Sequence, residues 1–315
     1  MPHPKLPDGE FISLFESLGA GPMAKRLGMN LRSIYSRREF IEKKIGRSLL
    51  SPNPHCATRV KTEHPGRLHC EVKNGVVLVG SDAHYWPGIV SAAHRAMVKF
   101  CKELQPKVVV INGDMLDGAA ISRHPPIGWE NHPTVKEEIE AVQERLGEIQ
   151  KAAFKAKRYW PLGNHDARFE TRLATAAPEY ARVNGVHLRD HFGADWEPCW
   201  SVWVNEDVVI KHRFKGGVHA THNNTLTAGK STVTGHLHSL KVTPYTDYAG
   251  TRFGVDTGTM ADPFGPQFEY QEDNPRNHRS GFAVLTFHRG RLLWPELVHV
   301  LSETEVEFRG TIVSV

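Results

Sequence analysis

Short runs of apolar, mostly β-branched residues recur along the chain, and each run leads into Asp, Asn or His. The runs are residues 76–79, 108–111, 159–162, 208–210 and 232–234. Uninterrupted apolar runs of this length are typical of strands that are buried on both faces. The pattern therefore predicts buried strands that end in Asp, Asn or His, which are side chains able to bind metal ions.

The stretches between the first three runs carry apolar residues at helical spacing. The first stretch has Ile89, Ala93, Met97, Phe100 and Leu104, and the second has Val135, Ile139, Val142, Leu146, Ile149 and Ala153. Thr134 and Glu137 form a capping-box signature at the start of the second. Strands that alternate with amphipathic helices predict an α/β fold with right-handed crossovers, in which the strand ends meet at one rim. Ligands of open α/β sheets bind at such a rim.

Residues 22–46 predict two short helices with a tight turn at residues 28–30. This segment resembles a helix-turn-helix, in which the second helix touches phosphates and base edges. The residues on or near that helix are Arg32, Ser33, Arg37 and Arg38. The alternative is a basic helical hairpin that packs on its own catalytic domain or on a protein partner.

Charge and composition divide the chain into regions. The 315 residues are 40% hydrophobic and 23% charged, which excludes disorder, collagen and a coiled coil. Residues 1–50 hold nine Lys and Arg against five acidic residues, so they carry the whole net charge of +4. We expect a basic module at 1–50, a Pro-rich linker at 51–70 and a catalytic domain at 71–315.

Neither a membrane span nor a secretion signal is expected, because no apolar run approaches about 18 residues and the first residues lack an apolar core. The four cysteines are too scattered for a metal knuckle or a disulfide scaffold, which favours reduced thiols. The sequence thus predicts a cytoplasmic protein without a membrane partner, and it leaves the oligomeric state open.

Histidines, carboxylates and one amide follow five of the predicted strands. They are Asp82, His84, Asp114, Asn164, His212, His236 and His238. Imidazole nitrogen and carboxylate or amide oxygen suit Zn, Mn or Fe better than Cu(I) or an iron–sulfur cluster. Seven such donors exceed the needs of one tetrahedral ion, so the pattern predicts two ions.

The order of these motifs resembles the calcineurin-like metallophosphoesterase family. Asp-x-His, Gly-Asp-x-x-Asp, Gly-Asn-His-Asp, a strand-end His and Gly-His-x-His follow one another within about residues 72–260. The resemblance implies a four-layer sandwich of two mixed β-sheets flanked by helices. It also implies that Asp82, His84 and His238 hold one ion, that Asn164, His212 and His236 hold the other, and that Asp114 bridges them.

The family's proton donor to the leaving oxygen corresponds to His165. Asp166 beside it either orients this imidazole and raises its pKa, or only starts the next helix. Many members have Gly after the strand-end His, whereas here Arg213 follows His212, so His219 and His222 stay open as substitutes. Serine/threonine protein phosphatases carry an Arg-Gly pair where Asp117 is followed by Gly118-Ala119, which argues against that activity.

These features predict a two-metal phosphoesterase that hydrolyses phosphodiester bonds with a metal-bridging hydroxide. Nucleic acid is the expected substrate, and a nuclease-like enzyme the expected function. Arg123 and His124 are candidates to bind phosphate, and Tyr85 and Trp86 to stack on a base. Manganese is expected to support activity in vitro, with Fe, Zn and Ni as alternatives. The competing hypotheses are hydrolysis of a small nucleotide or other phosphoester, and a DNA- or partner-binding protein with a vestigial metal site.

Overall fold

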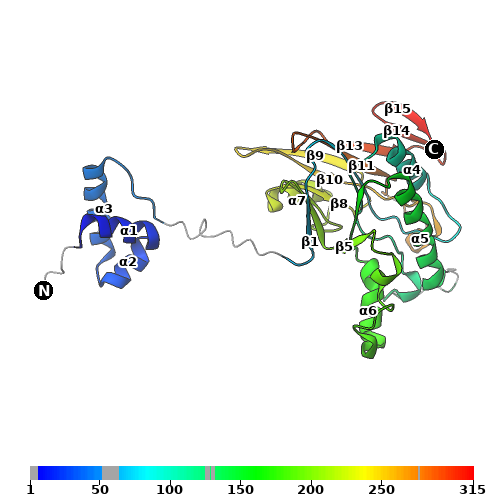
Figure 1. Ribbon diagram of the computed structural model, residues 1–315, viewed down its shortest axis with the longest axis horizontal. Coiled ribbons are helices and arrows are strands. Elements are labelled where there is room, and N and C mark those ends of the chain that lie inside the picture. Colours follow the sequence, from blue (N-terminus) through cyan, green and yellow to red (C-terminus); the bar gives the residue numbers. More distant parts are fainter. Residues whose placement is uncertain (1–5, 52–63, 125–127, 129–131, 276) are drawn as a thin grey trace. The chain divides into compact units, whose positions relative to one another are not determined.

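A computed structural model describes residues 6–51, 64–124, 128, 132–275 and 277–315 (Figure 1). The chain divides into two compact units, Met1–Glu63 and His64–Val315. Most of the expected linker, residues 52–63, lies outside the described residues. Its last part is not a linker, because residues 67–70 form a strand of the larger unit. Arg67 and Leu68 there pair in parallel with Ser201 and Val202, which uses backbone groups that a linker would leave to solvent.

The N-terminal unit contains α1 (Asp8–Leu18), α2 (Ala20–Leu27) and α3 (Leu31–Ile45). Gly28 ends α2 with a φ of 61°, and the Asn30 side chain caps α3 by accepting a hydrogen bond from the Arg32 N–H. The pattern had not indicated α1. Its Phe11 and Phe15 are buried with Met23 of α2 and with apolar residues of α3, so the unit has its own core.

The larger unit contains two mixed sheets. Within the described residues one sheet runs, in spatial order, β15 (Thr311–Ser314), β14 (Glu305–Phe308), β13 (Glu296–Val300), β11 (Gly281–His288), β2 (Gly75–Gly80), β3 (Val108–Ile111), β4 (Lys157–Pro161) and β5 (Glu197–Cys199), with β12 (Arg291–Leu292) on β11. The other runs β1 (Arg67–Cys70), β6 (Ser201–Val204), β7 (Val208–Ile210), β8 (Ser231–Thr234), β10 (Gly250–Asp256) and β9 (Lys241–Asp247).

Four α-helices accompany the sheets in the described part of the larger unit: α4 (Ala92–Leu104), α5 (Val135–Ala152), α6 (Asp166–Ala176) and α7 (Ala220–Ala228). α4 begins three residues later than the apolar spacing suggested, because the Ser91 side chain caps it and Ile89 stays outside. The capping box expected at Thr134 and Glu137 is present at the start of α5.

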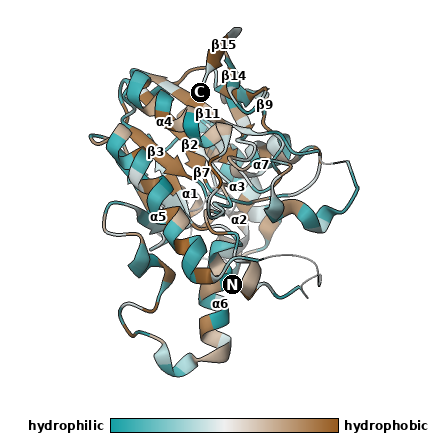
Figure 2. Ribbon diagram, turned by 90° about the vertical axis from the view of Figure 1, so that its right-hand side faces the viewer, coloured by the Kyte–Doolittle hydropathy of each residue, from teal (hydrophilic) through white to brown (hydrophobic). Residues whose placement is uncertain are grey.

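Alternating side chains of the buried strands separate two cores. Val77 and Val79 of β2 point into the core between the sheets, whereas Leu78 joins the core under α4 and α5. Figure 2 shows the apolar colour of β2 and β3 behind these two helices. α7 packs on β8, β9 and β10 at the other side. The fold is therefore the predicted one, two mixed β-sheets flanked by helices.

Two further expectations concern compartment and redox state. Among the described helices, none is long and apolar enough to cross a bilayer. Cys70, Cys101 and Cys199 are buried free thiols, and burial raises the pKa of Cys101 to about 12. Cys56 lies outside the described residues.

Candidate metal centre

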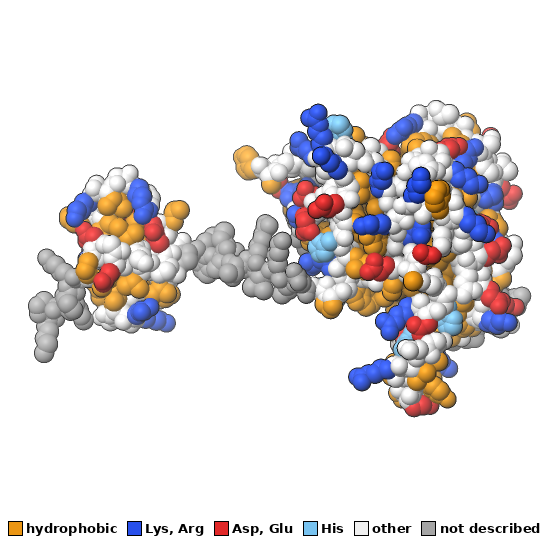
Figure 3. All heavy atoms as spheres, viewed as in Figure 1, with side chains coloured by type: hydrophobic (Ala, Val, Ile, Leu, Met, Phe, Trp, Pro, Cys, Tyr) orange, Lys and Arg blue, Asp and Glu red, His pale blue; other side chains and the backbone are white. Residues whose placement is uncertain are grey.

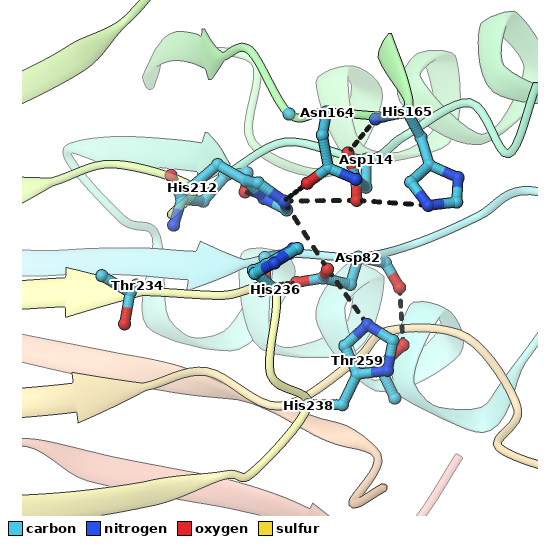
Figure 4. Close-up of polar contacts among 12 residues, drawn as sticks. Asp82, Asp114, Asn164, His165, His212, Thr234, His236, His238 and Thr259 are labelled. Atoms are coloured by element: carbon cyan, nitrogen blue, oxygen red, sulfur yellow. Dashed lines mark hydrogen bonds and ion pairs between the residues drawn. The ribbon is translucent and has the colours of Figure 1, made fainter. Parts of the chain in front are cut away.

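Five strand ends supply the predicted ligands. Asp82 and His84 follow β2, Asp114 follows β3, Asn164 follows β4, His212 follows β7, and His236 and His238 follow β8. Except for His84, which it does not label, Figure 4 shows these side chains pointing toward one another from both sheets. Parallel pairing aligns the carboxyl ends of β2, β3 and β4 in one sheet and of β7 and β8 in the other. The architecture therefore brings residues up to 156 positions apart into contact.

Distances between the donor atoms match those around a bound metal ion. His238 Nε2 lies 3.1 Å from Asp82 Oδ1, and His212 Nε2 lies 3.2 Å from Asn164 Oδ1 and from Asp114 Oδ2. Two ligands that are each about 2.1 Å from one ion, at tetrahedral or octahedral angles, are about 3.0–3.4 Å apart. These side chains are thus already spaced as ligands.

Among the described residues, three groups of donors could each hold a cation. Asp82, His84 and His238 form one, and Asp114, His212 and His236 form another; in each, the donor atoms lie within 4.8 Å of one another. A third group joins Asp114 to His84 and His165. Asp114 thus reaches both neighbouring groups, which is the position expected of a bridging carboxylate.

Hydrogen bonds at Nδ1 orient two of the imidazoles. His84 Nδ1 is 2.9 Å from Asp117 Oδ1, and His212 Nδ1 donates to the Asn112 carbonyl oxygen at 2.8 Å. His212 Nε2 then lies 3.2 Å from Asp114 Oδ2, and His84 offers a ring nitrogen to the group of Asp82 and His238. A carboxylate or carbonyl behind the ring is the usual support of a metal-binding histidine. The sequence showed Asp117 but gave no reason to assign it this role.

The ligand loops adopt backbone conformations that side chains rarely take. The φ angles are positive at Asp82, His84, Asp114, His236 and His238. Such strained positions persist only where the surrounding structure holds them, and they concentrate at functional sites. The ligand loops also lie so close together that two positions require glycine. A Cβ at Gly163 would overlap the Asp114 carboxylate, and one at Gly235 would overlap Asp82.

Buried charge dominates the electrostatics of the site. Burial favours the neutral forms of Asp82 and Asp114, but the charges and hydrogen bonds of the surrounding histidines, with His212 the strongest, together outweigh it and lower the pKa of both carboxyls. The same carboxylates raise the pKa of His212 against its burial. Among the described residues no Lys or Arg forms an ion pair with either aspartate. Carboxylates buried this way favour a bound cation as their charge partner.

His165 lies beside this cluster, but its ring partners differ from those expected. Nδ1 donates to the Asp117 carbonyl oxygen at 2.7 Å, and Nε2 is 3.1 Å from Arg168 Nη2 and 4.0 Å from Asp114 Oδ2. Burial opposes its charged form, yet the hydrogen bond to Asp117 and the charge of Asp114 raise its pKa.

Of the two roles expected for Asp166, the structure agrees with the second: α6 begins at Asp166, and its carboxylate hydrogen-bonds to groups other than the His165 ring. It accepts hydrogen bonds from the backbone N–H groups of Gly163, Asp114, Met115 and Leu116 and from Trp160 Nε1. This completely buried carboxylate therefore joins the loop after β4 to the loop after β3. Asp166 thus holds the loops of Asp114 and Asn164 together and does not pair with the His165 ring.

The two aromatic candidates also differ from expectation. Tyr85 is 4% exposed and its hydroxyl bonds to His94 Nδ1, so it belongs to the core and cannot stack on a base. Trp86 is half-buried and does not line the cleft beside the ligands. His219 precedes α7 and His222 packs on Tyr245, so His212 alone of the three alternatives joins the cluster.

A cleft of about 590 Å³ opens beside the second group of ligands, and Asn164 and His236 line its inner end. Arg123 and His124, the predicted phosphate contacts, line it as well. Arg168, Arg172 and Arg213 complete a basic wall that the sequence analysis missed. The four-residue spacing of Arg168 and Arg172 was the available signal, since it places both on one face of a helix.

The candidate nucleic-acid contacts of the N-terminal unit divide into two pairs. Arg32 and Ser33 are exposed at the start of α3. Arg37 instead bonds to the Leu6 carbonyl and lies 3.6 Å from Asp8, and Arg38 pairs with Glu42 at 2.8 Å. Arg37 and Arg38 also cover the rings of Phe11 and Phe15. These two arginines are engaged within the unit.

No protein-family model matches the chain, and no curated protein does. Among solved structures, Vps29 of Chaetomium thermophilum is 8% identical with a TM-score of 0.42, over 76% of this chain and 98% of its own. Zinc-complexed Vps29 of Entamoeba histolytica is 13% identical with a TM-score of 0.38, over 76% and 98%. A serine/threonine phosphatase of Saccharomyces cerevisiae is 10% identical with a TM-score of 0.38, over 76% and 85%. Because these TM-scores are below 0.5, we infer the fold and the site of this chain from its own topology and side chains.

Proposed function

We propose that this protein is a two-metal phosphoesterase of the calcineurin-like kind. The observation that carries the proposal is the meeting of two donor groups, Asp82–His84–His238 and Asp114–His212–His236, with Asp114 within reach of both. When bound, a pair of divalent or trivalent cations would lower the pKa of a shared water and stabilise charge on the phosphoryl oxygens. Asn164 completes the second group through its amide oxygen.

The proton for the leaving oxygen comes, in this proposal, from His165. Its Nδ1 is fixed on the Asp117 carbonyl, so the proton at issue is the one on Nε2. Arg168 now donates toward that nitrogen. A phosphate oxygen that binds the Arg168 guanidinium would compete with this contact and leave Nε2 available to carry the proton.

Phosphodiester bonds of nucleic acid are the substrate that we propose. The arginines of the cleft beside Asn164 and His236 support an anionic substrate larger than one phosphate. A small nucleotide or other phosphoester is the alternative, and a vestigial metal site the alternative of another class.

A substrate panel tests these proposals. The full chain, supplemented in turn with Mn, Fe, Zn or Ni, is assayed on a chromogenic monoester, a chromogenic diester, a cyclic nucleotide, and single- and double-stranded DNA. D114N serves as the blank. We expect hydrolysis of the diester and of DNA by the wild type alone. Hydrolysis of only the monoester or cyclic nucleotide favours the small-substrate alternative, and no hydrolysis with any ion favours the vestigial site.

For the N-terminal unit we propose a nucleic-acid docking role, supported by exposed Arg32 and Ser33. Deleting residues 1–50 should weaken cleavage of the polymer, most strongly at low salt, and leave hydrolysis of the small diester intact. Equal loss on both substrates would instead favour a unit that packs on the catalytic domain.

A further inference from the structure

One face of α6 carries polar residues from the metal centre outward. Arg168, Thr171, Arg172 and Thr175 follow at three- and four-residue spacing, which places them on one side of the helix. All four line the cleft that begins at Asn164. Figure 3 shows Lys and Arg side chains on the part of the larger unit that carries α6 and extends downward in this view.

The opposite side of α6 fixes this orientation. Phe169 packs against the core under α4 and α5. The Glu170 carboxylate lies 2.8 Å from His187 Nδ1 and accepts a hydrogen bond from the Leu188 N–H at 2.9 Å. Because these contacts hold the helix from behind, the Arg and Thr face is directed into the cleft.

Among the described residues, no acidic side chain neutralises the charge on this face. Those that line the cleft include no Asp or Glu. Within the described part of the chain, the guanidinium groups of Arg123, Arg172 and Arg213 form no ion pair and no hydrogen bond. Three unpaired guanidinium groups around one cleft favour an anion as the missing partner.

We propose that the cleft binds a second phosphate of the substrate, one position beyond the phosphate that is hydrolysed. This inference rests on the proposed phosphoesterase function, which it deepens. Arg168 contacts His165 beside the ligands, and Arg172 lies one helical turn further out on α6, about 6 Å along the axis. That offset suits phosphates joined through a sugar better than phosphates that share one oxygen. The cleft therefore selects a sugar–phosphate chain over a nucleoside polyphosphate or a simple monoester.

Matched chromogenic substrates test this directly. The first is the p-nitrophenyl ester of a mononucleotide, which has only the scissile phosphate. The second adds one nucleotide through a phosphodiester, and the third adds it through a neutral methylphosphonate. A fourth carries a pyrophosphate in place of the added nucleotide. We expect kcat/KM to rise for the second substrate alone, about tenfold, through KM.

R172A should abolish this advantage and leave the mononucleotide ester unchanged, and R172K should keep part of it because Lys retains the charge without the planar fork. R291A is the control, since Arg291 is exposed on β12 and does not line the cleft. An equal gain from the methylphosphonate, an equal or greater gain from the pyrophosphate, or an unchanged advantage in R172A would each overturn the proposal.

Binding without metal separates this inference from the proposed function. In the presence of a chelator, a fluorescent dinucleotide should bind the wild type more tightly than R172A, with R291A like the wild type. If that difference appears but no metal supports hydrolysis, the phosphoesterase function fails and the phosphate cleft stands. If hydrolysis occurs but R172A binds and cleaves as the wild type does, the cleft fails alone.

Discussion

Charged residues play different parts in two regions of the molecule, the rim of strand ends and the N-terminal unit. At the rim, Asp82 and Asp114 are buried, and within the described chain their ion-pair partners are all histidines. In the N-terminal unit the charges lie at the surface and pair locally, as Lys44 does with Asp8 and Arg47 with Glu16. A charge count along the sequence treats the two alike, although only burial makes charge expensive.

The comparison changes what the basic excess of the N-terminal unit means. Arg37, Arg38, Lys44 and Arg47 each lie near an acidic partner. Among its described residues the positive charges without such a partner are Lys25, Arg26, Arg32 and Lys43. Removal of one buried charge at the rim should therefore reduce function strongly. Removal of one exposed charge of the N-terminal unit should reduce it only slightly.

The largest effect is expected for D114N. Loss of the carboxylate that both donor groups reach should reduce metal content below two ions per chain. Activity should fall by more than the roughly 10–100-fold typical of residues that only support a ligand. Elemental analysis and diester hydrolysis measure both quantities, with D273N as an exposed control. Two-ion occupancy in D114N would contradict the bridging role.

H165A should come next. Removing a general acid typically costs about 10²–10⁴-fold in rate. Metal content should stay normal, because Asp82, His84 and the second group remain. H288A, which removes an exposed histidine of β11, is the matched control. A leaving group that needs no proton, such as p-nitrophenolate, should reduce the loss, and full activity of H165A on DNA would remove His165 from the mechanism.

Acid should destabilise the larger unit because it favours protonation of buried His94. Burial lowers the pKa of His94 to about 4, below its ordinary 6.5. The unfolded chain thus binds the proton first, and the free energy of unfolding should fall as the pH drops from about 6.5 to about 4, by at most about 3 kcal/mol. Neutral His94 accepts from the Tyr85 hydroxyl and donates to Glu148.

Chemical denaturation of the wild type and H94Q across this range isolates the effect, because other titrating groups are common to both proteins. The variant should lose part of the acid-side slope. Parallel stability curves would show that His94 keeps its ordinary pKa.

The sequence could reveal the ligands but not all of their supports. Strand ends are readable because an apolar run and the polar residue after it are neighbours in the chain, and Asp82, Asp114 and His238 could be found this way. Asp117 and Asp166 have the same local appearance as any loop acid. Their roles depend on which backbone and ring nitrogens the fold brings to them, and that information is not local. Tyr85 was misassigned for the same reason, since only the packing of α4 reveals that it is buried.

The smallest effect is expected for the charges of the N-terminal unit. Arg32 and Arg38, both on α3, form a matched pair of variants there. R32A should weaken binding of the full chain to DNA a few-fold, about equally across sequences, and lower the slope of log K against log salt by about one. R38A should leave that slope unchanged, because its guanidinium is already paired with Glu42. Fluorescence anisotropy at several salt concentrations measures both slopes. An equal decrease in the two variants would mean that the Arg38–Glu42 pair opens to bind phosphate, and an unchanged slope in R32A would remove α3 from nucleic-acid recognition.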